Sequence, residues 1–66
     1  MRRLEVPIEY KVLLILDEAS SLFNIGVNKL RELTNESNCP YVLFVGSKRL
    51  IKRIKLEEYL LREYSI

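Results

Sequence analysis

The residues best suited to binding chemistry lie in a cationic stretch in the second half of the chain. Residues 41–55 contain no acidic side chain and five basic ones, Lys48, Arg49, Lys52, Arg53 and Lys55. Lysine and arginine side chains pair with phosphate groups, and arginine does so through parallel N–H donors. Because the whole chain has a net charge of only +2, it is the uneven distribution of charge that predicts an anionic partner.

A second group of polar side chains recurs at helical spacing in residues 26–36. Val27, Leu30 and Leu33 fall on one apolar face, which leaves the opposite side of the helix polar. A helix of this kind fits a DNA major groove about 12 Å wide, where asparagine, arginine and lysine pair with base edges. The candidate side chains on the polar side are Asn28, Lys29, Arg31 and Asn35.

Both groups also have ordinary explanations. Any surface helix exposes polar residues, and basic residues in a hairpin can protect a sheet edge against aggregation. Glu32 lies among the helix candidates, and the sequence allows three roles for it. It could pair with Arg31 or Lys29, accept a hydrogen bond from a cytosine amino group, or weaken binding by repelling phosphates.

The first half of the chain contains the elements that must support these residues. Residues 12–15 are apolar and partly β-branched, which predicts a short strand buried on both faces. Residues 16–23 have helical periodicity, with Asp17 and Glu18 in the first turn, where acids favour the helix dipole. Asn24 tolerates the left-handed conformation that closes a helix, and Gly26 can cap the next one. The pattern predicts two helices joined by a tight turn.

The second half continues with a hairpin and a third helix. Residues 41–45 and 49–53 are predicted strands, with Gly46, Ser47 and Lys48 as the turn. From residue 55, Leu56, Tyr59 and Leu60 share one helical face. The resulting α+β order, strand-helix-helix-hairpin-helix, is that of a small winged helix-turn-helix, a DNA-binding fold. We therefore expect the hairpin and the second helix to project from one side of a single domain.

This domain takes up all 66 residues, since so short a chain forms one modest core. Its predicted parts are an N-terminal arm at residues 1–11, a recognition helix at 26–36, a wing hairpin at 41–53 and a C-terminal helix at 55–64. Tyr41 and Tyr59 fall at packing positions, so we interpret them as core residues rather than as bases for nucleotide stacking.

Other functional classes are disfavoured by composition. The chain has no histidine and a single cysteine, Cys39, so it lacks the commonest general base, an internal disulfide and a structural zinc site. We expect neither an enzyme nor a cofactor, and we interpret Cys39 as a passive thiol. No apolar run approaches the roughly 20 residues needed to cross a bilayer, so a cytoplasmic protein is expected.

The stretch LDEASSLFNIGVNKLREL resembles the helix-turn-helix of the excisionase family, with an acidic pair and Ala19 followed by a Leu-Arg-x-Leu second helix. The segments VPIEYK and IKR, together with a hairpin at Gly46, resemble the small excisionases of conjugative transposons, and the similarity covers nearly the whole chain. Two positions depart from the family pattern. Ile15 stands where relatives often have a capping threonine or serine, and Glu32 stands where a basic residue is frequent.

The resemblance implies a recombination directionality factor that bends DNA near the ends of a mobile element and helps a tyrosine recombinase, the integrase, to excise it. Its expected partners are double-stranded DNA, the integrase and further copies of itself on DNA. A transcriptional regulator of the same fold is the alternative, followed by a protein-binding adaptor. Helix 26–35 would enter the major groove and the hairpin would contact the minor groove, giving as DNA-binding candidates Asn28, Lys29, Arg31, Asn35, Ser47, Lys48, Arg49, Lys52 and Arg53.

Overall fold

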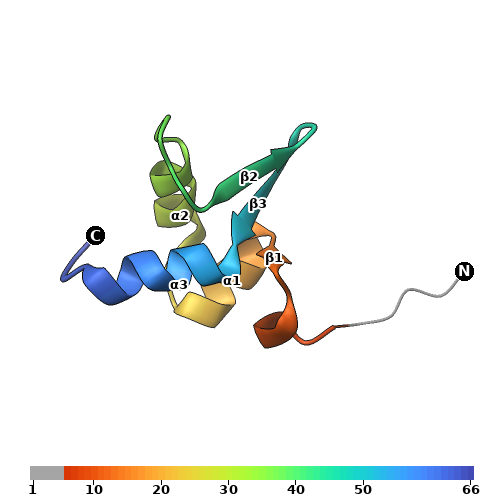
Figure 1. The fold of residues 1–66 in the computed structure, drawn as a ribbon, viewed down its shortest axis with the longest axis horizontal. Coiled ribbons are helices and arrows are strands. Elements are labelled where there is room, and N and C mark those ends of the chain that lie inside the picture. The colour runs from red at the N-terminus through yellow and green to blue at the C-terminus, as the bar shows by residue number, and fades with distance from the viewer. Residues whose placement is uncertain (1–5) are drawn as a thin grey trace, which may run out of the picture.

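The computed structural model describes residues 6–66, which form an α+β winged helix-turn-helix (Figure 1). A 3-10 helix, η1, precedes a short strand and two α-helices, and a hairpin and a third α-helix follow. The predicted element order is confirmed. The elements are η1 (Ile8–Tyr10), β1 (Leu13–Leu14), α1 (Leu16–Phe23), α2 (Val27–Thr34), β2 (Val42–Val45), β3 (Lys48–Lys52) and α3 (Arg53–Arg62). The first five residues of the predicted N-terminal arm lie outside the described residues.

The helix-turn-helix forms for the local reasons that the sequence indicates. Ile15 provides no side-chain cap to α1, but its backbone N–H donates to the Glu18 carboxylate over 3.1 Å. The helix ends at Asn24, which adopts the left-handed conformation with φ 59° and ψ 42°. Gly26 then caps α2. The turn between the helices is therefore set by one asparagine and one glycine, as predicted.

The first strand is shorter and less buried than predicted. Leu14 is fully buried, but the flanking residues Val12 and Ile15 are 69% and 41% exposed. The sheet order β1-β3-β2 explains the difference, because β1 lies at the edge of the sheet and pairs only with the last two residues of β3. The expectation of a strand buried on both faces was therefore wrong.

The hairpin is built on an antiparallel pair in which Val45 lies opposite Lys48 and Phe44 opposite Arg49. Gly46 and Ser47 form the two-residue turn, and Gly46 has φ +62°, a conformation that favours glycine. The third helix begins at once after β3. Its first residue is Arg53, which therefore belongs to α3 and not to the hairpin strand in which the sequence placed it.

The core takes residues from the sheet and from all three α-helices, including Leu14, Leu30, Ile51 and Leu56, none of which is exposed. Each such leucine or isoleucine stabilises the fold by roughly 2 kcal/mol relative to an exposed one. Tyr41 packs on Tyr59 with ring centroids 5.2 Å apart, which confirms the packing role predicted for this pair. Within residues 6–66 none of the helices has the length and apolar character needed to cross a membrane.

Candidate nucleic-acid interface

The two elements that carry most of the candidate residues, α2 and the β2–β3 hairpin, lie on one side of α3. In Figure 1, α2 and the β2–β3 hairpin both extend from the same side of α3, as a winged helix-turn-helix requires. Asn28 and Arg31 are exposed on α2, and Asn35 is exposed at its C-cap. Ser47 and Lys48 are exposed at the hairpin tip. These five candidate residues are therefore solvent-accessible on two elements that extend from the same side of α3.

Lys29 is engaged within the protein. Its Nζ donates to the Glu32 carboxylate over 3.0 Å and to the backbone carbonyl of Ile66 over 3.1 Å. Of the roles left open for Glu32, pairing with Lys29 is the one that the structure contains. The two side chains are 40% and 71% exposed, so solvent screens this ion pair and a partner phosphate can compete for the lysine.

The two lysines of β3 and the neighbouring Lys55 differ in whether they have an acidic partner. Lys55 lies 3.7 Å from Glu58 on α3, measured from Nζ to Oε1. Among the described residues, Lys48 and Lys52 form no salt bridge. Lys48 is exposed beside the turn, and Lys52 is half-buried at the junction with α3. Lys48 is therefore the cation of the hairpin tip that is most accessible to an approaching anion.

Arg49 faces α2 and contacts it. Its Nη1 donates to Thr34 Oγ1 over 3.1 Å and to the carbonyl of Arg31 over 3.4 Å. Its Cζ lies 5.5 Å from the ring centroid of Phe44, within the range of a cation–π interaction. The guanidinium is therefore held between the hairpin and the C-terminal turn of α2, where a cation complements the negative end of the helix dipole.

Sequence reasoning missed Thr34, which lies within the predicted helix 26–36 but was not among the candidate residues. Thr34 is the last residue of α2, is 2% exposed, and donates from Oγ1 to the carbonyl of Leu30 over 2.8 Å. The spacing contained a usable signal, because Thr34 follows Leu30 by four residues and so lies on the same helix face. A polar residue at that position needs partners, and it finds them in Leu30 and Arg49.

Arg53 lies at the base of the hairpin, away from its tip. Its Nε donates to the backbone carbonyl of Lys11. The Lys11 ammonium in turn forms a hydrogen bond and salt bridge with Glu18. This hydrogen bond, assisted by the one from the Ile15 backbone, lowers the pKa of Glu18 despite partial burial. Arg53 therefore connects α3 to the segment before β1.

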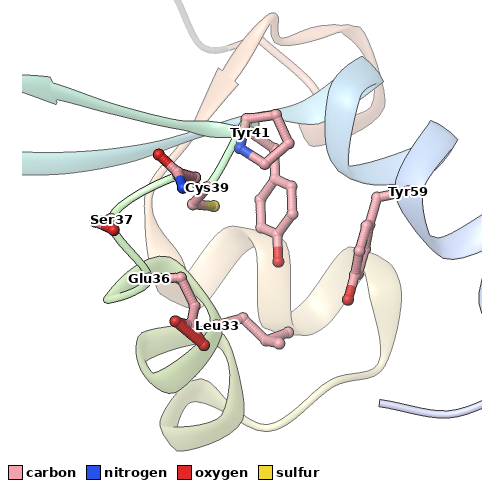
Figure 2. A pocket seen from close by; sticks show the side chains of 8 residues that line it. Leu33, Glu36, Ser37, Cys39, Tyr41 and Tyr59 are labelled. Carbon is pink, nitrogen blue, oxygen red and sulfur yellow. The ribbon is translucent and has the colours of Figure 1, made fainter.

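A hollow of about 360 Å³ opens between the end of α2, the following loop and α3. Figure 2 shows the rings of Tyr41 and Tyr59 side by side, with both hydroxyls pointing the same way and Cys39 beside Tyr41. Burial raises the pKa of Tyr41, and the Cys39 thiol adds to this effect. No group of three or more His, Cys, Asp or Glu residues in the described part of the chain could hold a metal ion.

Comparison of the sequence with known proteins identifies a relative. No family model matches the chain, and no solved structure matches it. Among curated proteins, the excisionase from transposon Tn916 of Streptococcus agalactiae is 37% identical over 59 residues, which are 88% of each chain. Identity at this level over nearly the full length of both proteins, together with the winged helix-turn-helix fold, shows that the chain belongs to the excisionase family.

Proposed function

We propose that this protein is a recombination directionality factor that binds double-stranded DNA near the ends of a mobile element and bends it. The bent DNA would let a tyrosine recombinase assemble the complex that excises the element. The observation that carries the proposal is the placement of α2 and the β2–β3 hairpin on one side of α3. Membership of the excisionase family supports the same biological role.

In the proposed complex, α2 enters the major groove and the hairpin follows the adjacent minor groove. Asn28, Lys29, Arg31 and Asn35 would contact base edges and flanking phosphates, which sets the preferred sequence. Ser47, Lys48, Arg49 and Lys52 would contact the backbone around the minor groove, and Arg53 would reach a phosphate beside it. These contacts fix the position of the protein on the duplex.

The protein would act through binding energy and would perform no bond-breaking step itself. Bending a site of 20–30 base pairs costs roughly 1–6 kcal/mol, which the contacts of α2 and the hairpin must offset. We place this activity in the cytoplasm, with the integrase and further copies of the chain as partners on DNA. Each copy would add one bend, so adjacent sites would draw the ends of the element together.

The test is a footprint of the purified chain across both ends of its own element, followed by excision with the cognate integrase. The proposal requires protection of discrete sites, slowed gel mobility that depends on where the site lies in the fragment, and excision that needs the protein. Equal affinity for these ends and for a random duplex would refute sequence preference. Site-specific binding without any effect on excision would instead support a transcriptional regulator.

A further inference from the structure

The wing and α2 are joined by a small set of contacts around one guanidinium. Among the described residues, the side-chain hydrogen bonds between the hairpin and α2 both come from Arg49. One of them ends on the hydroxyl of Thr34, which is nearly inaccessible to solvent. The other ends on the Arg31 carbonyl near the end of the helix. Arg49 therefore links the hairpin to a residue of α2 that lies 15 positions earlier in the sequence.

Each end of this link makes a further contact within its own element. The Thr34 hydroxyl donates its hydrogen to the Leu30 carbonyl over 2.8 Å, so its oxygen is oriented to accept from Arg49. On the hairpin, Arg49 lies directly opposite Phe44 in the strand register, and its guanidinium lies over the Phe44 ring. A planar guanidinium held by a ring and a buried acceptor has little freedom to rotate.

The outer part of the hairpin has little other support. Leu43, Phe44 and Val45 of β2 are 36%, 53% and 53% exposed, and β1 pairs only with Ile51 and Lys52 at the base of β3. The tip of the hairpin, residues 45–48, therefore extends beyond the core. Without a link to α2, this ribbon would be free to twist relative to the recognition helix.

We propose that the contact between Arg49 and Thr34 is a positioning device, which holds the wing at a fixed angle to α2 so that both elements engage one DNA duplex together. The inference rests on the proposed DNA-binding function and deepens it. Thr34 is buried and touches no DNA. Its part in binding is exerted through Arg49, and a rigid arrangement lowers the entropy cost of forming both sets of contacts.

Thr34→Val is the sharpest test because it removes the acceptor oxygen, keeps the side-chain shape and leaves every cationic side chain in place. We expect roughly three- to tenfold weaker binding to the preferred site, the range of one lost hydrogen bond. The dependence of affinity on salt should be unchanged, because the number of phosphates neutralised is unchanged. Thr34→Ser, which keeps the hydroxyl, should restore most of the affinity.

Arg49→Lys is the second single variant of a double-mutant cycle, since it keeps the charge but loses the planar donor group. The double variant with Thr34→Val should bind no more weakly than the weaker single variant, because both changes break the same link. Ser21→Ala, on the exposed side of α1, is the matched control. Wild-type affinity in folded Thr34→Val, or losses that multiply in the double variant, would overturn the inference.

A readout without DNA separates this inference from the proposed function. In Thr34→Val the backbone ¹⁵N heteronuclear NOE of Gly46 and Ser47 should fall, since the wing loses its contact with α2 while the core stays folded. Unchanged values would refute the positioning role. If the wild-type chain prefers no DNA site, the proposed function fails, and the NOE experiment still decides whether the link holds the wing.

Discussion

Arg49 of the hairpin donates a hydrogen bond to the hydroxyl of Thr34, the only buried polar residue at the end of α2 among the described residues. The cationic stretch is thus not uniform. One of its arginines connects the two elements proposed to contact DNA, and Arg53 connects α3 to the segment before β1. Lys48 remains exposed at the tip. These differences lead to separate expectations for each side chain.

Lys48→Ala should weaken binding to every duplex by a similar factor. If about four to six phosphates are neutralised, log affinity falls against log salt with a slope of roughly −4 to −5, and losing one contact makes the slope shallower by about one. Titration of a specific and a random duplex at several salt concentrations measures this. An unchanged slope would exclude Lys48 as a phosphate contact.

Asn28→Ala, unlike Lys48→Ala, should weaken binding to the preferred site more than binding to random DNA. Loss of a base-edge contact from α2 should cost roughly 1–3 kcal/mol at the preferred site and little on random DNA, because non-specific binding depends mainly on phosphate contacts. The ratio of the two affinities, measured at one salt concentration, is the relevant quantity. An equal loss on both duplexes would show that Asn28 does not read sequence.

Glu32→Gln removes the carboxylate that pairs with Lys29. The freed lysine and the loss of a negative charge near the duplex should strengthen binding about twofold, with a steeper dependence on salt. Fluorescence anisotropy with labelled duplexes is sufficient to detect this. Weaker binding confined to the preferred site would instead identify Glu32 as an acceptor for a cytosine amino group.

The Lys11–Glu18 pair should make stability depend on pH. The pKa of Glu18 is lowered from its usual 4.5 in the folded protein, so its contribution is present above that value and is lost as pH falls through the lower, folded-state pKa. Urea unfolding at pH 7 and pH 3 should show a smaller acid-induced loss in Glu18→Gln than in the wild type. Equal losses would contradict a stabilising role for this pair.

Gly46→Ala should destabilise the fold by roughly 1–2 kcal/mol through backbone strain, because φ at this position is +62°. A Cβ atom would meet no other atom within 4 Å, so crowding does not contribute. Gly46→Asn should cost less, since asparagine tolerates this conformation. Gly26→Ala is the comparison without this strain, because its φ of −59° suits any residue, and its cost should be limited to the poorer N-cap that alanine gives α2.

Local features of the sequence were sufficient to predict most of the fold. The bounds of α1, the left-handed Asn24 and the place of the hairpin turn at Gly46 depend on residues that are neighbours in sequence, although Lys48, predicted to lie in that turn, is the first residue of β3. The exposure of Val12 could not be predicted this way, because it depends on β1 lying at the sheet edge. The sequence likewise placed cations on the hairpin without indicating that Arg49 turns toward Thr34.

The edge position of β2 has a consequence for how the free protein behaves in concentrated solution. Its residues Val42–Val45 carry no charge, three of the four are exposed, and in the described chain the strand pairs only with β3. An uncharged, unpaired strand edge is a template on which another chain can add a strand. We therefore expect concentrated solutions of the free protein to associate through this edge, and an acidic or proline substitution on β2 to reduce that association.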